Sequence, residues 1–187
     1  MPNRVIRKLT MADASQFRDH LLRLDPESRI SRFSGFIGDT GVITYADRFD
    51  WLRAYAVGCF FDGELRGVAE LRPCSYGRDR VGEIALSVEA HWQGRGIGRE
   101  LLDRLVLIAR NRGFRILVML CLPTNQRMRD LAKRHRGRFE ADPGQVEACI
   151  VIDVADAFSM GQEALSDSLS AYASLLLGHT GKRADTH

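Results

Sequence analysis

The sequence predicts an α+β fold, and three observations lead to it. First, two β-rich runs flank Asp62-Gly63, a pair that strongly favours a two-residue hairpin turn. Second, residues 114–122 form an apolar run of strand length that only Arg115 interrupts, consistent with a strand buried on both faces. Third, segments with helical spacing of apolar residues lie between the strand-like runs, and no internal repeat is present.

The first third of the chain predicts one strand followed by helices. Residues 5–9 alternate apolar and polar side chains, which favours a strand. Thr10 can cap a helix over residues 11–24. Residues 27–41 predict a short helical turn that breaks into a glycine-rich loop, and residues 42–52 predict a further helical segment.

The middle of the chain predicts a sheet with two helices on it. The hairpin around Asp62-Gly63 is followed by a third strand, and these three strands are expected to be antiparallel. The third strand covers residues 81–88, and the later elements are a helix over 98–112 stopped by Gly113, the apolar strand, a helix over 123–135, and closing strands over 137–140 and 145–154.

Residues 155–187 form a separate C-terminal segment that follows the last predicted strand. Leu165, Leu169, Tyr172 and Leu176 recur at helical spacing, so we predict a C-terminal helix followed by a disordered tail. A helix that packs on the domain is the main expectation. A contact in a homodimer is the alternative.

Composition and charge exclude several classes of protein. The net charge is only +3 and the hydrophobic fraction is 45%, which do not indicate a nucleic-acid surface. The basic run 127–138 is best explained as the solvated face of a helix. No apolar run approaches the roughly 18 residues of a membrane span, and the first residues lack a signal peptide. Four cysteines and five histidines are scattered without metal-ligand spacing, so we expect a cytoplasmic protein without a metal.

Residues 91–99, HWQGRGIGR, join a predicted strand to a predicted helix. The N-terminus of a helix presents unpaired N–H groups and the positive end of the helix dipole, so it binds anions. The loop has glycine at three positions, Gly94, Gly96 and Gly98. These keep side chains away from the donors, while Arg95 and Arg99 add positive charge. The loop therefore predicts a phosphate or pyrophosphate site.

The spacing of these glycines discriminates between phosphate sites. The dinucleotide pattern GxGxxG fails because residue 99 is arginine, and no GK followed by Ser or Thr occurs. The pattern Q-x-x-G-x-G fits at Gln93, Gly96 and Gly98. With EIALSVEAHWQGRGIGRELL and ILVMLCLPTNQRMRDLA, the sequence resembles the Gcn5-related N-acetyltransferase (GNAT) superfamily over residues 4–154. The segment ESRISRFSG resembles the acetyltransferase domain of bacterial protein-lysine acetyltransferases.

This resemblance implies an N-acetyltransferase domain over residues 1–154. It also implies a mixed, mostly antiparallel sheet of six to seven strands flanked by helices, with acetyl-CoA as cosubstrate between the splayed fourth and fifth strands. Backbone groups left unpaired by the splay would bind the pantetheine arm, and one N–H there would polarise the thioester carbonyl. The implied cofactor-binding residues are Leu86, Ser87, Val88, Gln93, Gly94, Arg95, Gly96, Ile97, Gly98, Arg99 and Asn125.

An amine must lose a proton when it attacks, so the reaction needs a general base. The resemblance implies Glu83, at the start of the fourth strand, with Glu70 on the neighbouring strand as the competitor and a water chain as the third alternative. Either glutamate could instead pair with an arginine. Many family members carry a tyrosine as general acid where this sequence has Ala132, so the general acid stays unassigned.

The sequence thus predicts an acetyl-CoA-dependent N-acetyltransferase that transfers the acetyl group directly to a primary amine. The acceptor, a protein lysine or a small-molecule amine, is left open. The alternative is a non-catalytic acyl-CoA-binding sensor or regulatory module, which would keep the glycine loop but need no base.

Overall fold

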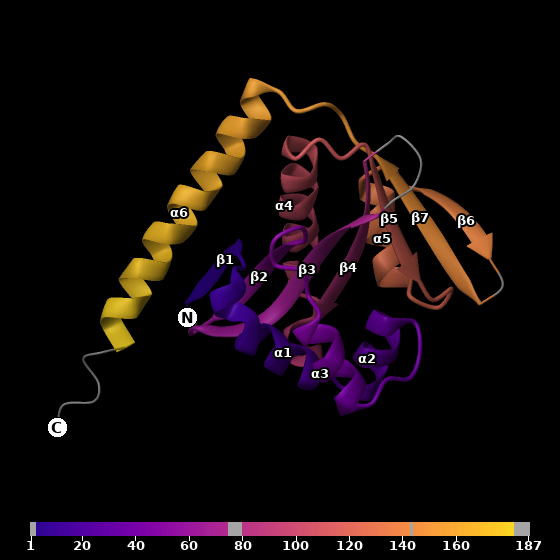
Figure 1. Cartoon of the computed structure of the whole chain (residues 1–187), viewed down its shortest axis with the longest axis horizontal. Helices are drawn as coiled ribbons and strands as arrows, with labels where there is room; N and C mark the ends of the chain where they lie inside the picture. Colours follow the sequence, from indigo (N-terminus) through magenta and orange to yellow (C-terminus); the bar gives the residue numbers. More distant parts are fainter. Residues whose placement is uncertain (1–2, 75–79, 143, 182–187) are drawn as a thin grey trace.

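The computed structural model describes residues 3–74, 80–142 and 144–181. Within them, seven strands form one sheet in the order β1-β2-β3-β4-β5-β7-β6 (Figure 1). The strands are β1 (Arg4–Lys8), β2 (Tyr55–Phe61), β3 (Glu64–Cys74), β4 (Val81–Val88), β5 (Ile116–Cys121), β6 (Arg138–Asp142) and β7 (Gln145–Val151). The helices are α1 (Ala14–Leu22), α2 (Pro26–Phe33), α3 (Asp39–Asp47), α4 (Ile97–Asn111), α5 (Gln126–Arg134) and α6 (Ala157–Gly181). This architecture confirms the predicted α+β class and the mixed, mostly antiparallel sheet.

The hairpin between β2 and β3 turns at Asp62-Gly63, as predicted. Both residues have positive φ, 49° and 82°, which a two-residue turn of type I′ requires. Gly113 also has positive φ, 77°, and follows the last turn of α4, as expected for a helix stop.

The two central strands β4 and β5 are parallel and separate half-way along. Their pairing runs from Val81 opposite Ile116 to Ile84 opposite Met119. Beyond that point β4 continues to Val88 paired with β3 alone, and β5 continues to Cys121 paired with β7 alone. The facing edges of the two strands therefore leave a gap in the sheet, which confirms the predicted splay.

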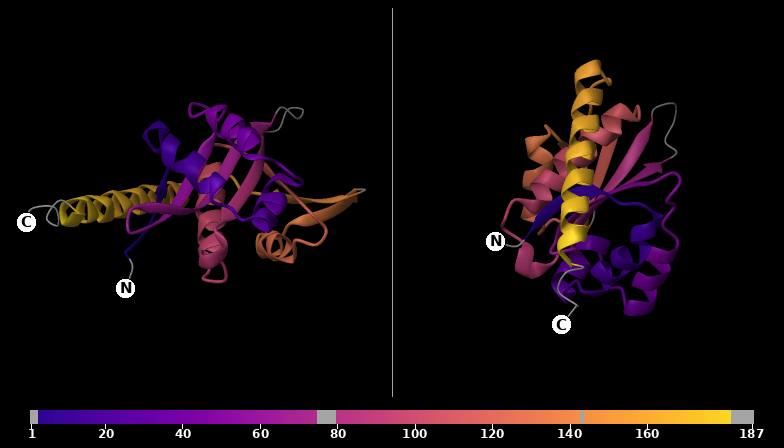
Figure 2. Two further views of the ribbon diagram at one scale, coloured as in Figure 1. Left: turned by 90° about the horizontal axis from the view of Figure 1, so that it is seen from below. Right: turned by 90° about the vertical axis from the view of Figure 1, so that its left-hand side faces the viewer.

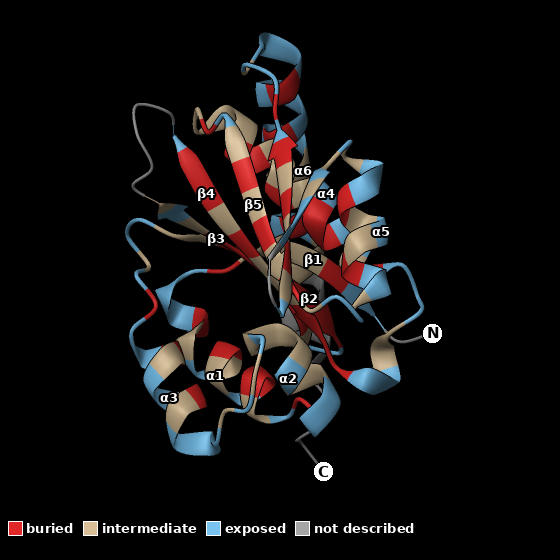
Figure 3. Cartoon of the chain, turned by 90° about the vertical axis from the view of Figure 1, so that its right-hand side faces the viewer, coloured by how far each residue is buried: buried red, intermediate tan, exposed pale blue. Residues whose placement is uncertain are grey.

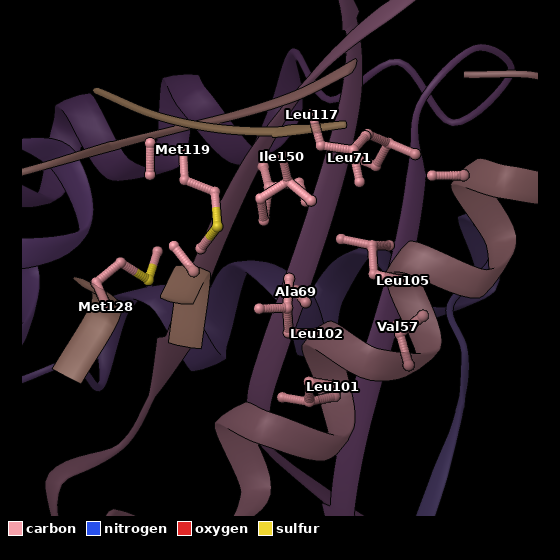
Figure 4. Close-up of a cluster of buried hydrophobic side chains, with 14 of the residues drawn as sticks. Val57, Ala69, Leu71, Leu101, Leu102, Leu105, Leu117, Met119, Met128 and Ile150 are labelled. Carbon is pink, nitrogen blue, oxygen red and sulfur yellow. The ribbon is translucent and has the colours of Figure 1, made fainter. Parts of the chain in front are cut away.

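Helices cover both faces of this sheet (Figure 2). On one face, α4 packs on the strands through a fully apolar cluster, in which Leu101, Leu102 and Leu105 meet Val57, Ala69 and Leu71 (Figure 4). On the other face, α1 and α3 bury a second cluster that includes Phe17, Leu21, Val42, Phe60 and Val68. The gap between β4 and β5 therefore opens in a sheet that has an apolar cluster on each face.

The apolar run in β5 is buried on one face only, so that expectation was wrong. Leu117, Met119 and Cys121 are buried, whereas the alternate residues Ile116, Val118 and Leu120 are half-buried (Figure 3). The reason is the extent of the helix layer: α1 packs on β3 and α2 reaches β4, but neither packs on β5.

The predicted C-terminal helix is present as α6, which lies beside β1 and α4 (Figure 1). The final residues 182–187 of the predicted tail lie outside the described residues. Among the helices that the structure describes, none combines the length and the hydropathy needed to cross a bilayer.

Candidate active site

The glycine loop lies where β4 ends and α4 begins. Gly94 and Gly96 have positive φ, 74° and 78°, and Gly96 is the N-cap of α4. A Cβ atom built on either residue would meet nothing within 4 Å. Glycine is therefore needed here for the backbone conformation, and it leaves the first N–H groups of α4 uncovered.

Gly98 has a different role from the other two glycines. It lies in the first turn of α4 with an ordinary helical φ, and a Cβ atom there would lie 3.4 Å from Leu86 and 3.7 Å from Leu131. Both leucines line the cleft described next. The absence of a side chain at Gly98 therefore widens the cleft.

A cleft of about 1070 Å³ runs from this loop along the open edge of β4. Ten of the eleven predicted cofactor-binding residues line it: Leu86, Ser87, Val88, Gln93, Gly94, Gly96, Ile97, Gly98, Arg99 and Asn125. Arg95 does not line it, and its guanidinium lies over the ring of Trp92, 5.0 Å from the ring centroid. The open edge of β4 and the bare start of α4 thus belong to one cavity.

The cleft has a third wall that the sequence did not reveal, the helix α2. Ser28, Ser31 and Arg32 line the cleft from this helix. Asp25 starts α2 by accepting hydrogen bonds from the backbone N–H and the hydroxyl of Ser28, at 2.9 and 2.7 Å. The short helical turn predicted within residues 27–41 is present as α2, but no nearby sequence feature indicates which part of the molecule this helix faces.

Two predicted cofactor residues are bonded to α2 across the cleft. The Gln93 side-chain amide donates to Ser28 Oγ at 3.1 Å and to the carbonyl of Val88 at 2.9 Å. The Asn125 amide donates to Ser31 Oγ at 2.6 Å, and its carbonyl oxygen caps α5 by accepting from the N–H of Met128. These bonds join three segments that are distant in sequence around one cavity.

Glu70 is fully buried in an ionic network on the α1–α3 face of the sheet. Its carboxylate accepts hydrogen bonds from Arg32 at 2.5 Å and from the Tyr45 hydroxyl at 2.8 Å, and Arg72 lies 3.5 Å away. Burial alone would lower the pKa of Arg32, but the Glu70 and Tyr45 side chains hold it above its usual range. Burial and the Glu70 carboxylate raise the pKa of Tyr45, so its hydroxyl stays protonated. Glu70 does not line the cleft.

Glu83 lies one residue before the last parallel pair of β4 and β5, opposite Arg72 on β3. Because side chains alternate along a strand, Glu83 shares the α1–α3 face with Ala85 and Ser87. It is half-buried, and its carboxylate makes no hydrogen bond or ion pair with any residue that the structure describes. Glu83 therefore lies at the closed end of the splay, outside the residues that line the cleft.

A buried polar array anchors the open half of β4 to α1. His20 is fully buried; its Nε2 lies 2.9 Å from Ser87 Oγ and its Nδ1 lies 3.2 Å from a Glu89 oxygen. Burial lowers the pKa of His20, so the neutral ring donates from Nδ1 to Glu89 and accepts from Ser87, an assignment made from the bonding pattern. Burial acts to raise the pKa of Glu89, but bonds from His20 and Arg23 hold it below its usual range.

Ala132, where the family resemblance places a tyrosine, is fully buried and belongs to the apolar core. The preceding residue, Leu131, lines the cleft instead. Among the described residues that line the cleft there is no tyrosine.

The residues that the structure describes contain no group of three His, Cys, Asp or Glu side chains that could hold a metal ion.

Comparison with known proteins relates this geometry to one family. The sequence pattern of the Acetyltransferase (GNAT) family matches residues 26–137. The chain is 30% identical over 131 residues to acetyltransferase PA5475 of Pseudomonas aeruginosa, a match that covers 68% of this chain and 70% of the relative.

Solved structures share the fold at lower identity. The GNAT domain of S. lividans PAT has a TM-score of 0.66 at 21% identity, over 79% of this chain and 89% of that one. The yncA protein of Salmonella typhimurium, solved with its cofactor acetyl-CoA, has a TM-score of 0.65 at 19% identity, over 83% and 97%.

Proposed function

This chain belongs to the acetyltransferase (GNAT) family, and we propose that it transfers an acetyl group from acetyl-CoA directly to a primary amine. One observation carries the proposal. The unpaired edge of β4 at Leu86–Val88 and the bare N-terminus of α4 line a single cleft. An extended pantetheine arm can pair with such an edge, and a pyrophosphate suits such a helix start.

The charged side chains around the cleft support an anionic occupant. Arg99 lies in the first turn of α4, and Arg127 and Arg134 line the cleft from α5. These arginines provide positive charge for the phosphates of CoA. The N–H groups at the start of α4 are fixed donors, so they need no rearrangement on binding. A backbone N–H on the open edge of β4 would polarise the thioester carbonyl.

We propose Glu83 rather than Glu70 as the general base. The carboxylate of Glu70 is already bonded to Arg32 and Tyr45, and a proton on Glu70 would leave the Arg32 charge buried without a counter-ion. The carboxylate of Glu83 has no such partner among the described residues. Proton transfer by Glu83 therefore disrupts no ion pair among the residues that the structure describes. The leaving thiolate needs little assistance, which fits the lack of a tyrosine among the residues lining the cleft.

The acceptor is a protein lysine or a small-molecule amine. The resemblance of residues 27–35 to bacterial protein-lysine acetyltransferases favours lysine, and α2, which contains most of that segment, forms one wall of the cleft. All four cysteines are free thiols, which favours a reducing compartment, so the cytoplasm is the proposed location.

Replacing Glu83 by Gln tests the proposal. Acetyl-CoA affinity is measured by calorimetry, and turnover by thiol release with a panel of amines and lysine peptides. We expect affinity to change less than about twofold, because Glu83 does not line the cleft, and kcat to fall about 10²- to 10⁴-fold through loss of the base. Glu147→Gln, the same change on β7, is the matched control and should retain full turnover.

The outcomes separate the alternatives. If wild-type protein binds acetyl-CoA but acetylates nothing in the panel, the chain is a non-catalytic acyl-CoA sensor. If Glu83→Gln retains full turnover, another group is the base. If acetyl-CoA does not bind at all, the assignment of the cleft is wrong.

A further inference from the structure

The C-terminal helix α6 packs on the domain with a polar face, the reverse of an ordinary surface helix. Glu163 and Ser170 are 7% and 8% exposed, and both face the domain. Glu163 pairs with Lys8 and with Arg112, and Ser170 donates to the carbonyl of Ile6 at 2.8 Å. Asp167 pairs with Lys8 at 2.6 Å and with Arg104 at 3.3 Å.

The opposite face of α6 is apolar and exposed. Phe158, Leu165, Leu169 and Tyr172 are 79%, 62%, 61% and 64% exposed. The helix contains no lysine or arginine, and its two acidic residues, Glu163 and Asp167, are both engaged with the domain. The outward face therefore has no charged side chain. Large exposed apolar patches on soluble proteins commonly mark interaction sites, so this face is a candidate for one.

The spacing along this face indicates what covers it. Residues 158, 162, 165, 169 and 172 follow one another at alternating intervals of four and three, which is the heptad spacing of a coiled-coil seam. All are apolar or aromatic except Gln162. Glu163, Asp167 and Ser170 occupy the heptad positions on the far side of the helix from the seam. The domain and the seam therefore use opposite faces of α6, and a second helix can reach the seam unobstructed.

We propose that the chain forms a symmetric dimer in which this seam packs against the same seam of a second copy. A heptad seam is specific for another helix, and in a symmetric pair the same surface covers itself on both subunits. The single polar residue of the seam, Gln162, fixes the register at some cost in stability. A membrane surface suits the seam less well, because interfacial helices carry lysine and arginine beside their apolar face and α6 has none.

Sedimentation velocity over a range of protein concentrations tests the proposal on the full chain. We expect the wild type to be a dimer at micromolar concentration. The double variant Leu165→Glu with Leu169→Glu places two charges in the seam, so its dimer dissociation constant should rise at least about 100-fold. The double variant Ala164→Glu with Ala171→Glu is the matched control, because it adds the same charges at exposed positions of α6 outside the seam and should remain dimeric.

Circular dichroism checks that both variants keep their helices, so a folding failure cannot be mistaken for dissociation. A wild-type monomer at all concentrations, or equal dissociation of both variants, overturns the proposal. Tight wild-type binding to vesicles of anionic lipid without self-association also overturns it. Acetyl-CoA binding by the seam variant should be unchanged, because none of the described residues that line the cleft belongs to α6. The dimer can therefore fail without the proposed activity failing.

Discussion

The two faces of the central sheet are built from different chemistry. The face under α4 is closed by apolar side chains, with Leu101, Leu102 and Leu105 fully buried. The face under α1–α3 buries an apolar cluster too, but it also buries ionisable groups, among them His20, Glu70 and Glu89. Burial of a charge costs free energy unless a partner compensates it. The first face therefore contributes stability through apolar burial. On the second face, part of that stability is offset by the free energy of burying polar groups beside the cleft.

The largest effect on stability should come from breaking the ionic network on the second face. Glu70→Ala leaves the charge of Arg32, whose side chain is only 6% exposed, without its buried counter-ion. We expect unfolding in urea to show a loss of about 3–5 kcal/mol. Glu100→Ala breaks an exposed ion pair with Arg4 and should cost less than about 1 kcal/mol. Equal losses in the two variants would mean that Glu70 is not a buried ionic partner.

A slightly smaller effect is expected from the apolar face. Leu105→Ala opens a cavity under α4 and should lower the free energy of unfolding by about 2–5 kcal/mol. Because Leu105 does not line the cleft, kcat per folded molecule should be unchanged at a temperature where the variant is folded. A fall in kcat without a fall in stability would contradict the division between the two faces.

The third effect depends on pH and belongs to the second face alone. Burial lowers the pKa of His20 in the folded protein, so the unfolded chain binds a proton first as the pH falls. The stability that neutral His20 contributes is complete above about pH 6.5 and is lost as the pH falls from there to the lowered folded pKa. Glu89, whose folded pKa is also lowered, adds a loss at more acidic pH.

Thermal unfolding from pH 8 to pH 5 measures this effect. His20→Asn should flatten the pH dependence in the upper part of that range, whatever it does to stability at pH 8. An unchanged slope in His20→Asn would remove His20 as its source.

The smallest expected effect is at Gly98, where one substitution should change the stability and the acetyl-CoA affinity in opposite directions. Gly98→Ala replaces a helical glycine and should raise stability by about 0.5–1 kcal/mol. The added methyl group narrows the cleft beside Leu86, so acetyl-CoA should bind more weakly. Gly161→Ala, at an open position of α6, should give the same gain in stability with unchanged affinity. Tighter acetyl-CoA binding by Gly98→Ala would contradict this account of the cleft.

Most of the helices and strands could be predicted from the sequence, because the patterns that specify them involve only neighbouring residues. The Asp62-Gly63 turn, the stop at Gly113 and the periodicity of α4 each depend on a few neighbouring residues, and each is present in the structure. The two-sided burial predicted for β5 failed for a non-local reason. An apolar run shows that a strand is apolar on both faces, but not which helices reach it.

The candidate site likewise has one part that local sequence motifs predict and one part that depends on contacts between distant segments. Ten of the predicted cofactor-binding residues line the cleft, and they lie in one contiguous stretch, 86–99, and at Asn125, so motifs of a few neighbouring residues were enough to select them. The wall formed by α2 and the partners of Glu70 could not be placed. Arg32 on α2, Tyr45 on α3 and Glu70 on β3 are brought together only by the tertiary fold, and no short-range sequence pattern predicts these contacts.

The position of α6 also has a consequence for how the protein is made. β1 is an edge strand, and the carbonyl of Ile6 on it is bonded to Ser170 and Arg104. The edge strand is therefore synthesised long before the helix that lies along it, since Ser170 follows Ile6 by 164 residues. An uncovered strand edge is a template for pairing with another chain. A truncated protein that lacks α6 would thus keep the residues that line the cleft but would tend to aggregate through the uncovered edge of β1.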